Sequence, residues 1–123
     1  MTAYEAFVAN LSNGNKVTTA QRLINDAPLA DLLHAVIGLS GEAGEVLDLT
    51  KKTLYYGRLL DRVALLEELG DALHYLTAAA VSQGWSIADV QQANMDKLCK
   101  RFPDGVFSVE KANLRLDKVL KAK

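Results

Sequence analysis

The sequence lacks any long apolar run, and it has a single cysteine and only two prolines among its 123 residues. A membrane-spanning helix needs about 20 predominantly apolar residues in succession, so the sequence offers no candidate span. Its first residues lack the basic-then-apolar order of a secretory signal peptide. Cys99 has no second cysteine with which to form an internal disulfide, in agreement with a reducing compartment. We therefore expect a cytoplasmic protein.

Internal repeats, low-complexity segments and linkers rich in Pro, Gly or Ser are also missing, and β-strand patterns are weak throughout. The chain has the length of one domain, and 50% of its residues are hydrophobic while 24% are charged. These proportions are ordinary for a globular protein and exclude extensive disorder. We expect residues 1–123 to form a single domain.

The net charge of −1 is unevenly distributed along the chain. Residues 1–96 hold six Lys and Arg against twelve Asp and Glu, whereas residues 97–123 hold eight against three. Such an asymmetry could place an acidic metal site beside cations that hold an anion, or it could be a plain surface pattern. Apart from this short basic segment, nothing suggests binding to a nucleic-acid polymer.

Apolar residues recur at intervals of three and four, as they do in amphipathic helices. Gly57, Gly84 and Pro103 are predicted to end helices, and Ser86 and Ser108 to cap their first turns. The expected fold is an all-α bundle of four or five helices. The predicted helices cover residues 2–11, 29–56, 59–83, 87–102 and 109–122, and the polar stretch 12–28 is ambiguous, with a helical turn near residues 19–26.

Two pairs of acids stand out on the long helices at 29–56 and 59–83. Glu42 and Glu45 are three residues apart, as are Glu68 and Asp71, so each pair projects from one face of its helix. The connection between these helices is short, which requires an antiparallel hairpin. Because the two pairs are equally far from the turn, we expect them to lie at one level.

Four carboxylates at one level repel one another, so a cation is needed between them. Carboxylate oxygens without a set of Cys or His ligands favour a hard ion, and Mg²⁺ is the expected occupant, with Mn²⁺ as a substitute. Paired acids at helical spacing are also common on solvated faces. In "EELGDALHYL", however, small residues and leucines stand where a solvated face would be expected to carry Lys or Arg. This pattern favours the metal site.

Three glycines, Gly38, Gly41 and Gly44, interrupt the same predicted helix beside Glu42 and Glu45. Each glycine inside a helix costs about 1 kcal/mol relative to alanine. We expect them to leave a surface without bulk, so that a neighbouring helix or a ligand can approach the backbone. The alternative is that they break the helix near residue 40.

Asn94, Lys97 and Arg101 fall on one stripe of the predicted helix at 87–102, and Lys52 lies two turns after Glu45 on the other helix. An amide can contact a base or a sugar, while an ammonium and a guanidinium neutralise phosphates. These four residues are the predicted substrate-binding group, although basic stripes are often only solvated.

Three stretches together resemble the MazG-like all-α nucleoside triphosphate pyrophosphohydrolases: "GLSGEAGEVLDLTKK", "LLEELGDALHYL" and "NMDKLCKRFPDGVFSVEKANLR". The resemblance implies that Glu42, Glu45, Glu68 and Asp71 bind Mg²⁺ and are catalytic. It implies hydrolysis of a nucleoside triphosphate to a monophosphate and pyrophosphate, in nucleotide-pool house-cleaning. It also implies self-association as a dimer or tetramer. Many relatives carry an acid where this chain has Gly41, so the general base is left unassigned.

Two other interpretations remain. Asp71 and His74, three residues apart, could belong to a four-helix di-iron carboxylate protein, although that chemistry normally needs a Glu-x-x-His element on each of two helices. Alternatively, the acids and bases could form the salt-bridged surface of a helical interaction protein without enzymatic activity.

Overall fold

The all-α class is confirmed: in this computed structural model, which describes residues 1–12 and 16–119, helices are the only regular elements. The chain divides into two compact units, Met1–Gln83 and Gly84–Lys123, each of which is described by itself. The first unit contains α1 (Ala3–Ser12), α2 (Lys16–Asn25), α3 (Ala27–Tyr56) and α4 (Arg62–Ser82), and the second contains α5 (Ile87–Arg101), α6 (Val109–Leu114) and α7 (Leu116–Val119).

The longest helix, α3, begins and ends where local chemistry favours it. The side chain of Asp26 accepts a hydrogen bond from the backbone N–H of Leu29, and Pro28 occupies the first turn, where its missing N–H costs nothing. At the other end, Gly57 adopts a left-handed conformation with φ 64°. A residue with a side chain would be strained there, so the predicted stop at Gly57 is confirmed.

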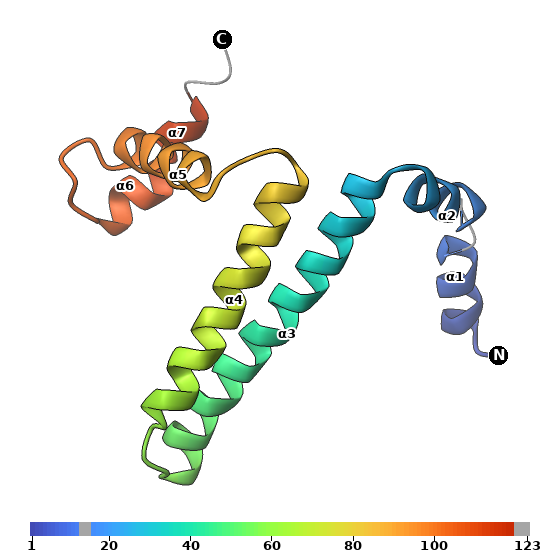
Figure 1. Cartoon of the computed structure of the whole chain (residues 1–123), viewed down its shortest axis with the longest axis horizontal. Coiled ribbons are helices and arrows are strands. Elements are labelled where there is room, and N and C mark those ends of the chain that lie inside the picture. Colours follow the sequence, from blue (N-terminus) through green and yellow to red (C-terminus); the bar gives the residue numbers. More distant parts are fainter. Residues whose placement is uncertain (13–15, 120–123) are drawn as a thin grey trace. The chain divides into compact units, whose positions relative to one another are not determined.

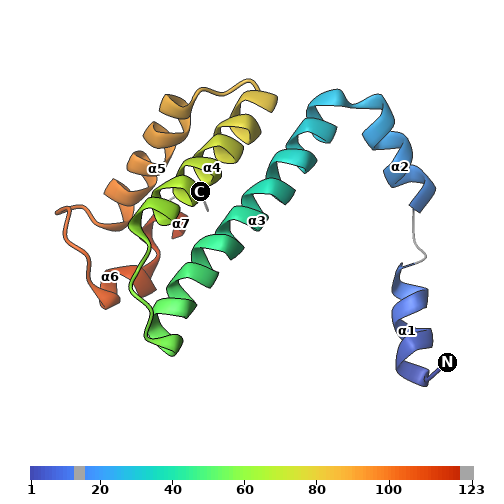
Figure 2. The ribbon, with the colours of Figure 1, turned by 60° about the horizontal axis from the view of Figure 1, so that its bottom comes forward.

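The next helix, α4, starts three residues later than predicted, at Arg62 instead of Leu59. The carboxylate of Asp61 accepts hydrogen bonds from the backbone N–H groups of Val63 and Ala64, and this cap fixes the first turn. Residues 57–61 connect α3 to α4, and the two helices lie side by side in opposite directions (Figures 1 and 2). The side chain of Gln83 donates a hydrogen bond to the carbonyl of Pro28, which links the far ends of the pair.

Small residues allow α3 and α4 to approach closely. Ala35 on α3 and Ala80 on α4 are the fully buried apolar residues of the described chain. A Cβ atom added to Gly38 would lie 2.3 Å from Cε1 of Tyr75, so the tyrosine ring fills the space that the glycine leaves. The expected close approach is therefore confirmed at Gly38, whereas nothing within 4 Å would meet a Cβ at Gly41 or Gly44. The glycines do not break the helix.

Much of the apolar surface of the α3–α4 hairpin faces outward. On α4, the apolar stripe of Leu66, Leu69, Leu73 and Leu76 is exposed at every position, from 40% at Leu76 to 72% at Leu66. On α3, Ile37 and Leu47 are 63% and 66% exposed. Two helices cannot enclose a core between them, so these side chains remain uncovered within the described chain.

The N-terminal helices differ modestly from the prediction. The first helix is shifted by one residue, to Ala3–Ser12, and the ambiguous stretch contains a helix of ten residues, α2, instead of one turn. The predicted break "SNGN" lies mostly outside the described residues, since 13–15 are not described. None of the described helices is long and apolar enough to cross a membrane.

In the second unit, α5 begins with the predicted cap. Ser86 accepts a hydrogen bond from the backbone N–H of Asp89, whose carboxylate accepts one from the N–H of Ser86, so the two form a capping box. The helix ends at Arg101, one residue before the prediction, because Phe102 precedes Pro103 and takes a non-helical conformation, with φ −128° and ψ 75°.

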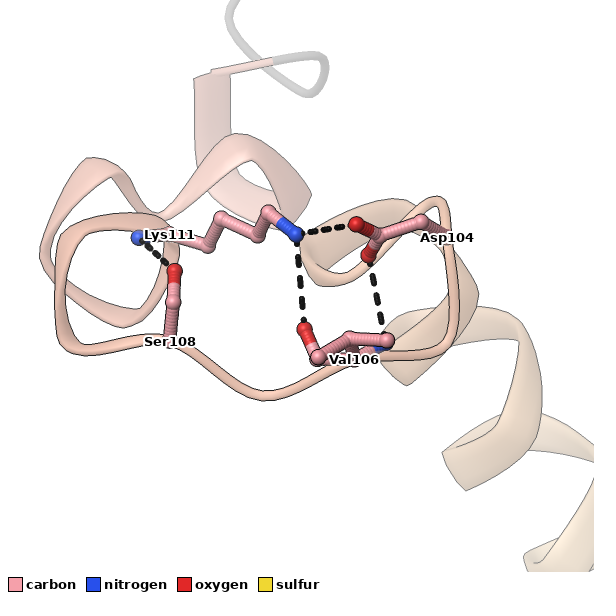
Figure 3. A network of polar contacts seen from close by, with 4 residues as sticks. All are labelled: Asp104, Val106, Ser108 and Lys111. Carbon is pink, nitrogen blue, oxygen red and sulfur yellow. Dashed lines mark hydrogen bonds and ion pairs between the residues drawn. The ribbon is translucent and has the colours of Figure 1, made fainter.

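Polar contacts fix the loop between α5 and α6 (Figure 3). The carboxylate of Asp104 accepts hydrogen bonds from the backbone N–H of Val106 and from the ammonium of Lys111, which also donates to the carbonyl of Val106. Ser108 caps α6 by accepting a hydrogen bond from the backbone N–H of Lys111. The predicted helix start at Ser108 is confirmed.

The prediction of a single helix over residues 109–122 is wrong within the described part of the chain, where two short helices, α6 and α7, take its place. Arg115 has φ 50°, a left-handed conformation that separates α6 from α7. Such a conformation costs about 1–2 kcal/mol for a residue with a side chain. It is offset by Asp117, which accepts two hydrogen bonds from the guanidinium of Arg101. Residues 120–122 of the prediction lie outside the described residues.

The two glycines Gly38 and Gly41 offer a matched test of the packing between α3 and α4. Gly41→Ala should raise the free energy of unfolding by about 1 kcal/mol, because it improves helix propensity without a clash. Gly38→Ala should lower it by about 1–3 kcal/mol, because the new methyl group displaces the ring of Tyr75. Denaturant unfolding followed by circular dichroism measures both. Equal effects of the two substitutions would contradict the packing described here.

Candidate metal centre

The contact between Gly38 and Tyr75 sets the level at which the acids meet. Four residues further along α3 stands Glu42, and four residues back along α4 stands Asp71, so these two acids lie opposite each other. Three more residues along each helix bring Glu45 opposite Glu68. Because α3 and α4 run in opposite directions (Figure 1), the residue spacing puts the two pairs at neighbouring positions along the hairpin.

Three of the four acids come together. Glu42, Glu68 and Asp71 each offer a carboxylate oxygen, and these oxygens lie within 4.8 Å of one another. Glu42 and Glu68 are half-buried, whereas Asp71 is exposed. Glu45 is exposed and lies outside this group of three. We call Glu42, Glu68 and Asp71 the carboxylate cluster.

The pKa of Glu68 shows how burial and the neighbouring acids act on the cluster. Partial burial raises the pKa of Glu68 above its ordinary value, and a hydrogen bond to Glu42 raises it further. The negative charges of Glu42, Glu45 and Asp71 act in the same direction. Glu45 therefore influences Glu68 although its carboxylate is outside the cluster.

The donor set suits a hard divalent cation. Three carboxylate oxygens within reach of one another can share one ion, and carboxylates are the protein ligands that Mg²⁺ and Mn²⁺ prefer. A bound cation would also offset the burial of the Glu68 carboxylate and the repulsion from its neighbours, which together raise its pKa. Among the described residues, this is the one group of three or more that could hold a metal, and it contains no histidine. His74, which the di-iron alternative needs, instead packs against the ring of Tyr75.

The structure engages two of the predicted substrate-binding cations in ion pairs. The ammonium of Lys52 pairs with Asp48, one turn earlier on α3, and this hydrogen bond lowers the pKa of the Asp48 carboxyl. The guanidinium of Arg101 forms two hydrogen bonds, of 2.8 and 2.9 Å, with Asp117. The hydrogen bonds from Arg101 lower the pKa of Asp117 to about 2, and this aspartate is buried.

The other two members of the predicted substrate group, Asn94 and Lys97, are exposed on α5. Lys97 lines a pocket of about 240 Å³ in the second unit. Three lysines surround this pocket, which gives it an excess of positive charge over its two aspartates. Its lining residues are Ala93, Asp96, Lys97, Lys100, Asp117 and Lys118.

The sequence did not predict the contacts that Tyr75 makes beside the cluster. Tyr75 packs on Gly38, and His34 and His74 approach its ring edge-on, with centroid distances of 6.1 and 5.2 Å. The available clue was spacing, because Tyr75 follows Asp71 by one turn on the same face of α4. An aromatic residue opposite a glycine in an antiparallel hairpin indicates such a contact.

The model of one protein family matches most of the hairpin and the helix after it. The MazG nucleotide pyrophosphohydrolase domain matches residues 29–106, a range that includes all four acids together with Asn94, Lys97 and Arg101. No curated protein and no solved structure matches the chain.

The raised pKa of Glu68 predicts a pH dependence of stability without divalent ions. A carboxyl whose pKa is raised by folding stabilises the folded state below its unfolded pKa, and this contribution is lost as the pH rises through the folded pKa. At about pH 7 the variant Glu68→Gln should therefore unfold at a higher temperature than the unsubstituted chain, and the difference should shrink towards about pH 4.5. Thermal unfolding in EDTA measures it.

Glu67→Gln serves as the control for this pH dependence, because Glu67 is an exposed glutamate on the same helix and lies outside the carboxylate cluster. A stability difference for Glu68→Gln that did not change with pH would contradict the raised pKa of Glu68.

Proposed function

The chain belongs to the MazG nucleotide pyrophosphohydrolase family, and we propose that it hydrolyses a nucleoside triphosphate to the monophosphate and pyrophosphate with Mg²⁺ as the cofactor. The observation that supports this most is the carboxylate cluster, whose three oxygens lie within 4.8 Å of one another inside the matched range. Mn²⁺ is the expected substitute ion.

Glu42, Glu68 and Asp71 would hold the ion, and Glu45 would complete the set of four acids. Glu45 is exposed and unpaired in the described chain, so its side chain can turn toward the cluster when the repulsion there is relieved. When bound, a divalent ion neutralises phosphate charge and favours departure of the pyrophosphate. The chain therefore supplies an acidic, half-buried seam that attracts an ion and keeps it in place.

The proposed reaction adds the oxygen of water to the α-phosphorus and breaks the bridging bond between the α- and β-phosphates. The electron pair of that bond leaves with pyrophosphate, and the proton lost by the attacking water passes to the solvent. Because Gly41 stands where many relatives have an acid, the acids available on α3 to orient this water are Glu42 and Glu45.

Asn94 and Lys97 are the exposed members of the proposed substrate-binding group, and they remain available to a nucleotide. Lys52 and Arg101 can join them only by exchanging a carboxylate partner for a phosphate. That exchange replaces one charge-assisted hydrogen bond by another of the same type, since phosphate oxygens accept hydrogen bonds from ammonium and guanidinium groups as carboxylates do. It is harder for Arg101, whose partner Asp117 is buried and doubly hydrogen-bonded.

Self-association belongs to the same proposal. Leu66, Leu69 and Leu73 are 72%, 50% and 56% exposed on a single stripe of α4, and monomeric proteins rarely expose a contiguous apolar surface of this kind. A second hairpin would cover it by forming a four-helix bundle. We propose a dimer, or a tetramer built from two dimers, that acts on the nucleotide pool of the cytoplasm.

The reaction predicts that the purified chain releases pyrophosphate from at least one nucleoside triphosphate in the presence of Mg²⁺. EDTA should abolish release and Mn²⁺ should restore it. In ¹⁸O-labelled water the label should enter the monophosphate, because the water attacks the α-phosphorus. Glu42→Gln, Glu45→Gln and Glu68→Gln should each lower kcat by about 100-fold or more, since each removes a charge from the metal site.

Glu110→Gln is the matched control for these charge-removing substitutions, because Glu110 is an exposed glutamate of α6 and should leave kcat unchanged. If the unsubstituted chain released no pyrophosphate from any of the common ribo- and deoxyribonucleoside triphosphates, the proposed activity would be overturned. Label in pyrophosphate instead of the monophosphate would refute attack at the α-phosphorus.

Light scattering coupled to size exclusion should give the mass of two or four chains of 13.4 kDa each. Leu66→Lys should shift the chain toward the monomer, because it places a charge in the proposed interface. Leu59→Lys is the control, since Leu59 is 96% exposed in the connection between α3 and α4. A monomeric mass for the unsubstituted chain at micromolar concentration would rule out the assembly.

A further inference from the structure

A group of three rings lies near the carboxylate cluster, about one helical turn away on α4 and two turns away on α3. Tyr75 follows Asp71 by four residues on α4, and His34 precedes Glu42 by eight on α3, with Gly38 between them. Four residues advance a helix by about 6 Å, and residues at this spacing share a face. We call His34, His74 and Tyr75 the ring group.

Packing holds the ring group in place. The ring of Tyr75 occupies the space that Gly38 leaves open, where an added Cβ would lie 2.3 Å from Cε1 and 2.5 Å from Cζ. His34 meets this ring at an interplanar angle of 80°, and His74 meets it at 77°. Edge-to-face contacts of this kind favour a fixed mutual orientation of the three rings.

The polar atoms of the ring group are not used by the fold. Both histidines are exposed and Tyr75 is half-buried. Within the described chain, neither the imidazole nitrogens nor the phenol hydroxyl forms a hydrogen bond, although each of them can donate or accept one. No buried side-chain polar atom of the described residues lacks a partner, so the imidazole nitrogens and the phenol hydroxyl are open to solvent and to a ligand.

The neighbourhood of the cluster favours this end of the seam for a ligand. Toward the connection at 57–61, the half-buried positions next to the acids include Val46, Leu49, Ala64 and Leu65, which are apolar and carry no ring, and Asp48, whose carboxylate is already paired with Lys52. Toward the open end lie the half-buried Gly38 and Tyr75, with the exposed His34 and His74 beside the tyrosine ring. A nucleotide has its phosphates at one end and its base at the other, with one sugar between, a separation comparable with one turn of helix.

We propose that His34, His74 and Tyr75 form the nucleoside-binding part of the site, contacting the base and sugar while the carboxylate cluster holds the ion at the phosphates. This rests on the proposed function. Aromatic faces stack on bases of every type, and imidazole and phenol groups donate to and accept from base edges and sugar hydroxyls. His34, His74 and Tyr75 are thus specificity-determining residues for the hydrolysis.

The chain contains two histidines, so proton NMR can follow the imidazole signals of both. Each signal is assigned by its loss in His34→Gln or His74→Gln. With Mg²⁺ present, the probes are AMP, GMP, CMP, UMP and their deoxy forms, none of which the proposed reaction cleaves, and inorganic tripolyphosphate, which has no base. We expect both histidine signals to shift with at least one monophosphate and to remain in place with tripolyphosphate.

Affinities complete the test. His34→Gln and Tyr75→Phe should each weaken monophosphate binding by about tenfold or less, as expected for one lost hydrogen bond. Both should leave the affinity for tripolyphosphate and the helical circular dichroism unchanged. Tyr55→Phe is the control, because Tyr55 is 80% exposed near the end of α3.

Equal shifts with tripolyphosphate and the monophosphates, or no shift with any of them, would overturn the assignment of the ring group. The two proposals fail separately. Histidine shifts that depend on the nucleotide, without release of pyrophosphate, would refute the proposed reaction and support the nucleoside site. Release of pyrophosphate with unresponsive histidine signals would remove the nucleoside site and keep the reaction.

Discussion

The mutual repulsion of carboxylates held at one level of a helical hairpin is the constraint on which the remaining features depend. Glu42, Glu68 and Asp71 lie within 4.8 Å of one another because α3 and α4 approach closely, and this approach in turn requires small residues along the seam. Partial burial raises the pKa of Glu68, and the hydrogen bond to Glu42 and the repulsion from the neighbouring carboxylates raise it further. A divalent cation is the simplest relief, so the packing of two helices leads directly to a need for a metal.

The sequence predicted the elements whose ends are fixed by local chemistry. Gly57 and Ser86 mark helix ends because a left-handed residue and a side-chain cap act within a few residues. The spacing of the acids likewise predicts that they share helix faces. The start of α4 was missed because Leu59 continues the apolar pattern, although Asp61 provides the cap. Contacts between distant residues were harder, since no local rule pairs Tyr75 with Gly38 or Arg101 with Asp117.

Two of the predicted substrate-binding cations are already paired with acids, whereas the acids of the carboxylate cluster are not paired with cations among the described residues. Lys52 and Arg101 already have carboxylate partners, and the pair formed by Arg101 ties α7 to α5 through the buried Asp117. The carboxylate cluster has no such partner among the described residues. A metal ion can therefore bind carboxylates that have no cationic partner. A phosphate, in contrast, must compete with aspartates for Lys52 and Arg101, two of the four predicted substrate-binding residues. Asn94 and Lys97 carry no such competition.

The contact between Gly38 and Tyr75 also restricts how the chain can change over time. A bulky side chain at position 38 is compatible with the present spacing of α3 and α4 only if position 75 becomes smaller, so the two positions form a reciprocal pair. A slip of one residue along either helix would put Leu39 or Leu76 where the ring meets the glycine. The contact of Tyr75 with Gly38 thus fixes the register of the hairpin, and a larger residue at position 38 should occur together with a smaller one at position 75.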